Sequence, residues 1–314
     1  NKGDDWEEIS KDLTSGGKKG NVPYGTITSF DESNFQFGKL IVGSDDGIVS
    51  ISNDSGKTWK SVSDNLPPDL WVSRVIFSKH KKNTIYLSLN GYRYNDFKPY
   101  IYVSNDNGDS WENISSNLPL SPVNVIREDI NRKEILYVGT DNGLFISFSS
   151  GKKWHPFESS LNRVAVHDLV IQNEKNDLLV GTHGRSIYKT NLDLFNDFMI
   201  EKNGEKPLII FEINDLRHSN SWGKRSNYSD DVFKSSVKTI VYSDKSIIYD
   251  YTITDNFNNI LNKGKLNLDK GFNNIEIMPM INYSIATKKL KKIGISSEKS
   301  EDGNIYLPLS LIHI

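Results

Sequence analysis

The sequence contains no cysteine, which excludes disulfide bonds and thiolate metal sites. It also contains no apolar run that approaches the roughly 20 residues of a membrane span, so we expect no membrane-spanning segment. Its first ten residues, "NKGDDWEEIS", lack the apolar core of a signal peptide. The absence of cysteine does not fix the compartment, because many secreted bacterial proteins also lack cysteine.

Neither sign of charge is in excess: 38 Lys and Arg face 40 Asp and Glu, giving a formal net charge of -2. Such a balance provides no long-range attraction to nucleic acid, and we expect no nucleic-acid partner. The six histidines show no metal-ligand spacing, and the chain has neither a phosphate-binding loop nor a G-x-S-x-G motif. The sequence therefore predicts no metal and no cofactor.

Aromatic residues and repeats are abundant instead. The phrase "SNDSGKTW" (52–59) returns as "SNDNGDSW" (104–111), more weakly as "SFSSGKKW" (147–154), and as the tail "GDDW" (3–6). The tryptophans that end these copies are spaced by 53, 52 and 43 residues. A period of this length is typical of β-propeller blades.

A second phrase repeats in step with the first, as "GSDDG", "GTDNG" and "GTHGR", beginning at Gly43, Gly139 and Gly181. Short apolar runs precede each copy, so every period holds four strand signals separated by Gly, Asp and Asn turns. The pattern predicts an all-β fold made of four-stranded, up-and-down blades.

On these motifs the chain resembles the Asp-box (BNR-repeat) β-propeller family, in particular a sortilin-like and glycosyl-hydrolase-like subgroup of Bacteroidetes-type bacteria. The resemblance covers about residues 1–192 and implies about four blades of a larger ring. It also implies that the Asp-box is a structural turn between the third and fourth strands of a blade. The residues with this structural role are Ser52, Asp54, Gly56, Trp59, Ser104, Asp106, Gly108, Trp111, Gly151 and Trp154.

Alternating strand directions place the Asp-box turns on one face of the disc and the second-to-third turns and blade links on the other. Propeller ligands usually bind at such a central mouth. The candidate ligand-binding residues on this second face are Arg74, Arg93, Asp96, Lys98, Tyr100, His167, Asp168, His183 and Arg185. Two alternatives stay open: the insert 90–100 packs over a neighbouring blade, and His167 with Asp168 satisfies a buried strand end. Arg127 is expected to form an internal salt bridge with Glu128 and Asp129.

After residue 192 the repeat stops. Residues 193–206 are interpreted as a linker, and alternating segments within 207–314 predict a small antiparallel β-sandwich. In the family that the blades resemble, such a sandwich often follows the last blade. We interpret the chain as the C-terminal part of a longer secreted, cell-surface or periplasmic protein. Its ending "LSLIHI" (309–314) resembles translated sequencing-adapter sequence rather than protein. Residues 6–10 are an alternative fourth strand for the last blade, which would close a four-bladed ring.

These observations predict a module that binds an extracellular glycan or protein. One alternative is a glycoside hydrolase with its site at the mouth, which needs two carboxylates about 5 to 9 Å apart. The other is a sortilin-like peptide receptor. The sequence identifies no catalytic residue.

Overall fold

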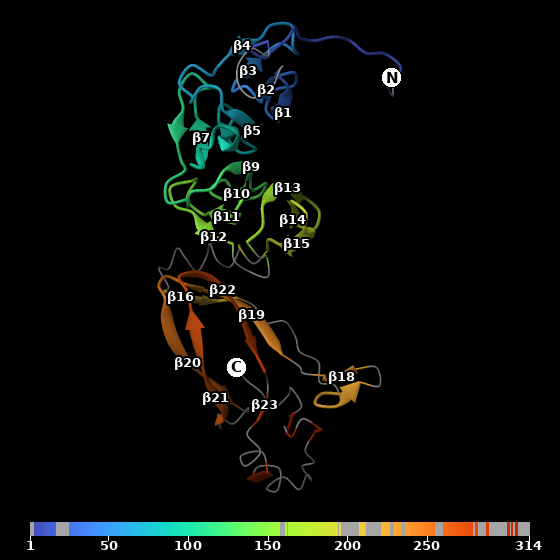
Figure 1. The fold of residues 1–314 in the computed structure, drawn as a ribbon, viewed down its shortest axis with the longest axis vertical. Coiled ribbons are helices and arrows are strands. Elements are labelled where there is room, and N and C mark those ends of the chain that lie inside the picture. Colours follow the sequence, from blue (N-terminus) through green and yellow to red (C-terminus); the bar gives the residue numbers. More distant parts are fainter. Residues whose placement is uncertain are drawn as a thin grey trace. The chain divides into compact units, whose positions relative to one another are not determined.

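The secondary structure of this chain, taken from a computed structural model, is almost entirely antiparallel β-sheet (Figure 1). The chain divides into two units, Asn1–Asp193 and Leu194–Ile314. The structure describes residues 3–16, 25–157, 161 and 163–193 of the first unit. In the second it describes residues 195, 207–211, 221–226, 229–233, 236–254, 260–278, 280–281, 287–288, 300–301, 303 and 305–306. The predicted linker therefore lies mostly, and the ending 309–314 wholly, outside the described residues.

Three complete blades, each a four-stranded sheet paired in chain order, follow one another in the first unit. Blade 1 contains β1 (Ile27–Glu32), β2 (Leu40–Ser44), β3 (Val49–Ser52) and β4 (Lys60–Ser61). Blade 2 contains β5 (Trp71–Phe77), β6 (Ile85–Asn90), β7 (Tyr100–Ser104) and β8 (Glu112–Asn113), with a 3-10 turn, η1 (Tyr92–Tyr94), between β6 and β7. Blade 3 contains β9 (Val123–Glu128), β10 (Leu136–Thr140), β11 (Gly143–Ser147) and β12 (His155–Pro156).

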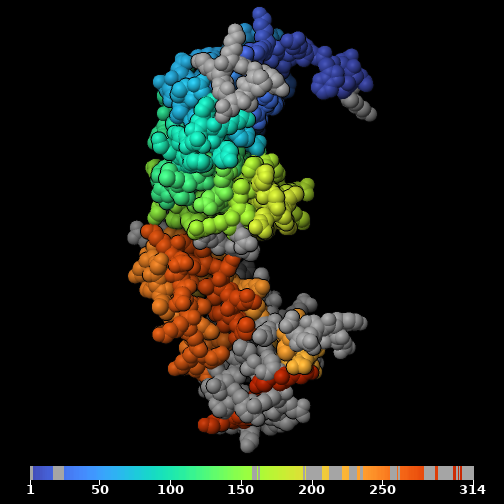
Figure 2. Space-filling view, viewed as in Figure 1, coloured from blue at the N-terminus to red at the C-terminus, as the bar shows by residue number. Residues whose placement is uncertain are grey.

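Blade 4 has three described strands, β13 (Val166–Gln172), β14 (Asp177–Thr182) and β15 (Ile187–Asn191). In Figure 2 the four blades occupy successive bands of colour in chain order. The prediction of an all-β fold built from four-stranded blades is confirmed.

The core lies between consecutive blades. Blades 1 and 2 bury one apolar cluster between them, and blades 2 and 3 bury a second. Because alternate side chains of a strand face opposite sides of its sheet, blade 2 contributes to both clusters. The strands at the centre of the unit are consequently buried on both faces, as in β6 (Ile85–Asn90), where every residue is buried.

Each innermost strand carries a β-bulge at the same place. The extra residues are Thr28, Ser73, Asn124 and His167. The first three each donate a side-chain hydrogen bond to the inner strand of the next blade, with acceptors Val72 O (2.6 Å), Val123 O (2.7 Å) and Val166 O (3.2 Å). These bonds fix the spacing of the blades. A Cβ at Gly43 would lie 2.2 Å from Val72 Cγ1, so glycine in the second repeated phrase permits this close approach.

The Asp-box phrase forms the turn between the third and fourth strands. Asp54 accepts hydrogen bonds from the backbone N–H of Thr58 (2.9 Å) and from its hydroxyl (2.7 Å), and Ser52 Oγ accepts the N–H of Gly56 (2.9 Å). Gly56 has φ +86°, a left-handed conformation that favours glycine. Asp106 repeats these bonds with Ser110, which lower the pKa of Asp106 to about 2. In the third copy, Ser149 accepts one such bond, from Lys153 N (3.1 Å).

The tryptophan of each Asp-box joins its blade to the preceding one. The indole N–H groups of Trp59, Trp111 and Trp154 donate to Ile9 O (3.1 Å), Val62 O (2.8 Å) and Ile114 O (2.8 Å). Each acceptor lies three residues beyond the tryptophan of the previous copy, and Ile9 follows Trp6 in the same way. Ile9 therefore contacts blade 1, a different position from the alternative in which residues 6–10 complete blade 4.

The second unit contains a three-stranded sheet of β16 (Leu208–Ile210), β19 (Val237–Ser243) and β22 (Gly271–Ile277). A hairpin of β20 (Ile247–Thr254) and β21 (Ile260–Leu268) packs on it around a shared apolar core. Two short pairs complete its described strands, β17 (Arg225–Ser226) with β18 (Ser229–Val232) and β23 (Met280–Ile281) with β24 (Ile305–Tyr306). Among the described residues, no helix is long and apolar enough to cross a membrane.

Candidate functional site

The direction of the strands separates two faces of the blades. The first-to-second turns and the Asp-box turns lie at one end of the strands, here called the box face. The second-to-third turns, the links between blades and the bulges of the inner strands lie at the other end, here called the mouth face. This separation follows from the antiparallel pairing of consecutive strands.

Three inner strands bring charged side chains together on the inner side of the blades. Arg74 Nη2 of β5 lies 2.8 Å from Asp168 Oδ1 of β13, and Arg127 Nη2 of β9 lies 3.5 Å from the same oxygen. The Arg74–Asp168 pair thus joins blades 2 and 4 across blade 3. We call Arg74, Arg127 and Asp168 the inner-strand cluster. It unites two predicted site residues, Arg74 and Asp168, with Arg127, for which the sequence predicted an internal salt bridge instead.

The inner-strand cluster carries two positive charges and one negative charge. Burial lowers the pKa of Arg127, and the positive charge of the neighbouring Arg74 lowers it further. Arg74 Nε is buried and has no hydrogen-bond partner within the described residues. The Asp168 side chain, in contrast, is 53% exposed. The arrangement leaves a surface with a net positive charge that can accept an anionic group.

The prediction that Arg127 forms a salt bridge with Glu128 and Asp129 is wrong. Consecutive residues of a strand point to opposite faces of the sheet, so Arg127 faces blade 4 whereas Glu128 faces blade 2. Arg127 Nε donates to Leu169 O (2.7 Å), and the partner of Asp129 is Arg132 (3.1 Å). The presence of a charged residue in each of the three largely apolar inner strands β5, β9 and β13 is the sequence signal that could have selected Arg127.

The insert 90–100 lies over blade 1. Arg93 Nη1 is 3.1 Å from Asp45 Oδ2, and its guanidinium carbon is 5.2 Å from the centre of the Trp71 ring. Asp96 accepts hydrogen bonds from Tyr100 Oη (2.6 Å) and Lys98 N (3.1 Å). The first of these bonds lowers the pKa of Asp96. Arg93, Asp96 and Tyr100 therefore hold the insert in place, and three aromatic side chains remain exposed on it: Tyr92, Tyr94 and Phe97.

A buried polar chain links the insert to blade 3. Asn90 Nδ2 donates to Asn124 Oδ1 (2.9 Å), and Asn124 Nδ2 donates to Asp141 Oδ1 (2.8 Å) as well as to Val166 O. Asn90 and Asn124 are both buried, so these bonds satisfy groups that would otherwise lie unpaired in the core. They give the mouth face a fixed frame.

The remaining predicted site residues lie at the mouth end of blade 4. His167 occupies the bulge of β13, and His183 and Arg185 lie in the turn between β14 and β15. All three are exposed. The rings of His167 and His183 are 5.0 Å apart between centroids, with an interplanar angle of 46°. The structure thus divides the predicted site into the inner-strand cluster, the insert and this histidine pair.

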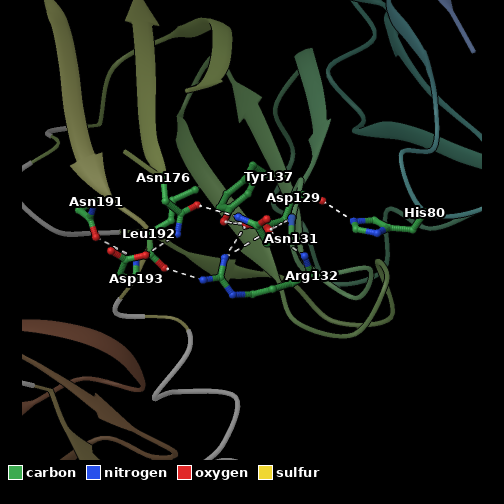
Figure 3. Close-up of polar contacts among 9 residues, drawn as sticks. All are labelled: His80, Asp129, Asn131, Arg132, Tyr137, Asn176, Asn191, Leu192 and Asp193. Carbon is green, nitrogen blue, oxygen red and sulfur yellow. Dashed lines mark hydrogen bonds and ion pairs between the residues drawn. The ribbon is translucent and has the colours of Figure 1, made fainter. Parts of the chain in front are cut away.

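The box face carries a separate polar network, drawn in Figure 3, of which the sequence predictions named only Asp129, with a different partner. Asp129 is fully buried and accepts hydrogen bonds from Tyr137 Oη (2.7 Å), from Arg132 Nη1 and from the backbone N–H of Asn131 and Arg132 (both 2.9 Å). His80 Nε2 lies 2.7 Å from Asp129 O, and Arg132 reaches Leu192 O (3.3 Å). The network connects the first-to-second turns of three blades and is structural.

Glu128 is a second buried acid between blades 2 and 3. Its carboxylate accepts hydrogen bonds from Ser78 Oγ (2.9 Å), Lys79 N (2.5 Å) and Tyr86 Oη (3.2 Å). Burial nevertheless raises the pKa of Glu128, because the hydrogen bonds do not fully replace water. The folded protein therefore holds this proton more tightly than the unfolded chain does.

A pH dependence of stability follows from Glu128. The stability that it contributes is fully present below about pH 4, near the pKa of free glutamate, and is lost as pH rises through its folded-state pKa. We expect the free energy of unfolding of the unsubstituted chain, relative to Glu128→Gln, to fall as pH rises from about 4. Urea unfolding of both proteins at several pH values checks this. A difference that does not change with pH contradicts it.

In the described part of the chain, no group of three or more His, Cys, Asp or Glu side chains could hold a metal ion. An open hollow of about 520 Å³ lies at the box end of β1, with Phe30, Phe37 and Lys79 in its lining. It contains none of the predicted site residues.

Comparison with known proteins identifies the relatives of this chain. The Sortilin-Vps10 family model, described as "Sortilin, neurotensin receptor 3,", matches residues 99–306. The vacuolar protein sorting/targeting protein PEP1 of Saccharomyces cerevisiae is 31% identical over 99 residues, which are 32% of this chain and 5% of PEP1. The chain thus spans a small part of the length of the curated relatives it matches.

Solved structures with similar folds are more distant. The GH74 xyloglucanase from Xanthomonas campestris has a TM-score of 0.42 and 14% identity, covering 52% of this chain and 29% of that one. YCF48 bound to D1 peptide has a TM-score of 0.41 and 16% identity, covering 54% of this chain and 52% of that one. At these levels the similarities assign no function.

Proposed function

Because this chain belongs to the Sortilin-Vps10 family, we propose that its blades form part of a receptor domain that binds a protein or peptide ligand. The matching family model carries the name of a receptor, and the yeast relative carries the name of a protein-sorting factor. As part of the same proposal, the domain acts outside the cytoplasm, as a secreted, cell-surface or periplasmic protein.

The inner-strand cluster is the observation that carries this proposal. Two arginines from adjacent blades share one exposed aspartate, which leaves the cluster with a net positive charge. A carboxylate of a ligand can accept bidentate, charge-assisted hydrogen bonds from such guanidinium groups. It would also reduce the repulsion between Arg74 and Arg127. The ligand that fits best is a peptide or protein segment that presents a carboxylate to the inner strands.

Glycoside hydrolysis has less support in this chain. A general acid needs a raised pKa, as in glycosidases. Burial disfavours the charged form of Asp46, but hydrogen bonds from Ser15 and Ser44 outweigh it and lower its pKa, and a hydrogen bond from Tyr100 lowers that of Asp96. Glu128, whose pKa burial raises, lies buried at the box end of β9, away from the mouth face.

Glycan binding is a second candidate, favoured by the aromatic insert. Tyr92 is 60% exposed and Phe97 45%, and their rings meet edge to face with centroids 6.0 Å apart. Exposed aromatic rings on a loop that Arg93 holds in place can stack on the apolar face of a sugar. This candidate requires the insert, whereas peptide binding requires the inner-strand cluster.

The test uses two bead-bound libraries of random peptides, one with free C-terminal carboxylates and one with amidated C-termini. We expect the chain to retain free-acid peptides. The double variant Arg74→Gln/Arg127→Gln should weaken binding of the selected peptides by at least about tenfold, since hydrogen bonds to charged groups contribute about 1.5–3 kcal/mol each. Fluorescence polarisation of the selected peptides measures the affinities.

The matched control is Lys57→Gln/Lys60→Gln, which removes the same charge from exposed positions at the box face. It should bind as the unsubstituted chain does. Equal binding by the arginine variant contradicts the proposal. Retention of oligosaccharides, lost with Tyr92→Ala but unaffected by the arginine changes, would favour the glycan candidate instead.

A further inference from the structure

The histidine pair of blade 4 results from two departures from the repeat. The turn position of His183 holds Asp45 in blade 1 and Asp141 in blade 3, with the same backbone hydrogen bond to the inner strand in all three blades. The bulge position of His167 holds Thr28, Ser73 and Asn124 in blades 1 to 3. Blade 4 thus has a histidine at the turn position and another at the bulge position. These two positions are adjacent in the fold.

The two rings are available to a ligand. Both side chains are exposed, and their ring nitrogens have no hydrogen-bond partner in the part of the chain that the structure describes. Asp168, next to His167, is held by Arg74 and Arg127 on the inner side. Asn124 Nδ2 donates a hydrogen bond to Asp141 and another to Val166 O, and so holds Asp141 in place. At the mouth end of blade 4, the ring nitrogens of His167 and His183 are therefore available to coordinate a ligand.

The spacing of the rings matches that of two imidazoles on one metal ion. Metal–nitrogen bonds of about 2.0–2.1 Å at a tetrahedral angle place two ring centroids roughly 5 Å apart, and the observed distance is 5.0 Å. We infer that His167 and His183 form a two-histidine site for a divalent first-row transition metal ion of the kind that imidazole prefers, Cu²⁺, Ni²⁺ or Zn²⁺.

The two histidines fill only part of the coordination sphere of a metal ion. Because the described residues include no group of three or more potential ligands, they leave at least two positions of a tetrahedral metal ion to water or another molecule. Such a site binds metal reversibly. Binding requires neutral imidazole, because a ring nitrogen that coordinates a metal ion cannot also carry a proton. Arg185, in the same turn, is the nearest positive charge in sequence and also opposes a cation.

Isothermal titration of the whole chain with NiCl₂, and electron paramagnetic resonance after adding CuCl₂, test the site. We expect one site of higher affinity than any other, with a Cu²⁺ spectrum that shows two imidazole nitrogens. His167→Asn and His183→Asn should each weaken Ni²⁺ binding at least about tenfold and reduce the nitrogen coupling to one imidazole. Circular dichroism of each variant establishes that the fold is kept.

His218→Asn serves as a control of the same residue type in the second unit and should leave the site unchanged. Equal Ni²⁺ affinity in the unsubstituted chain and the His167 and His183 variants, or a Cu²⁺ spectrum with one nitrogen in the unsubstituted chain, would overturn the inference. The metals alone are the probes, so the result does not depend on the peptide ligand. Loss of peptide binding and loss of metal binding are therefore separate outcomes.

Discussion

Replacing Trp154 with alanine is expected to lower the free energy of unfolding of the first unit by about 3–5 kcal/mol, the usual cost of removing a large buried aromatic side chain. Trp154 is 1% exposed and belongs to the core that blades 2 and 3 share. Its indole N–H also donates to Ile114 O at 2.8 Å. The substitution leaves both a cavity and an unpaired carbonyl between two blades.

The other copies of the repeat supply the control. Trp6 ends the first copy of the same phrase but is 90% exposed, so Trp6→Ala should change stability by no more than about 0.5 kcal/mol. Trp154→Phe keeps most of the buried volume, loses the hydrogen bond to Ile114 O, and should fall between the two. Urea unfolding followed by far-ultraviolet circular dichroism gives the comparison. A similar loss of unfolding free energy in Trp6→Ala and Trp154→Ala would contradict the prediction, because it would show that burial of the tryptophan does not determine its contribution to stability.

Asp129→Ala is expected to cost a similar amount, about 3–5 kcal/mol, because it removes one partner of a buried ion pair. Asp129 is fully buried, the Arg132 side chain is 10% exposed, and their closest oxygen and nitrogen are 3.1 Å apart (Figure 3). Without the carboxylate, the Arg132 guanidinium and the Tyr137 hydroxyl lose an acceptor in a place that water does not reach. Burial, with the charge of Asp129, raises the pKa of Tyr137, so this hydroxyl stays a donor.

Two companion variants separate charge from packing. Asp129→Asn keeps the size and one acceptor oxygen but leaves Arg132 without a counter-charge, and it should destabilise less than Asp129→Ala. Tyr137→Phe removes one hydrogen bond and should cost about 1 kcal/mol. Asp109→Ala breaks an exposed pair with Lys60 and should have little effect, since exposed pairs contribute little. If Asp129→Ala unfolds at the same urea concentration as the Asp109 variant, the network does not hold the blades together.

The fold of the first unit was predictable because its signals are local and repeated. The Asp-box fixes its own turn through bonds between residues two to four positions apart, such as Asp54 with Thr58. A glycine with positive φ and four apolar runs per period need no distant partner to be recognised. For the same reason the spacing of the tryptophans predicted the blades.

The candidate site was predictable only in its location. Strand direction places the loops on one face, and this followed from the order of the strands. Which side chains meet there depends on the bulges of the inner strands, which shift the register by one residue and so change the face of every residue beyond them. Arg127 was assigned to the wrong partners for a separate reason, since consecutive residues of a strand face opposite sides of its sheet, although Arg74 and Asp168 were both selected.

By itself, the sequence determined the all-β class, the four strands of each blade, the place of the Asp-box turns and the face that carries the candidate site. Only the tertiary structure decided that Arg74 of blade 2 reaches Asp168 of blade 4, and that His167 and His183 lie together although the sequence shows no metal spacing. The physical reason is that hydrogen bonds within a turn are encoded by neighbouring residues. Contacts between inner strands, in contrast, depend on how closely whole blades approach one another.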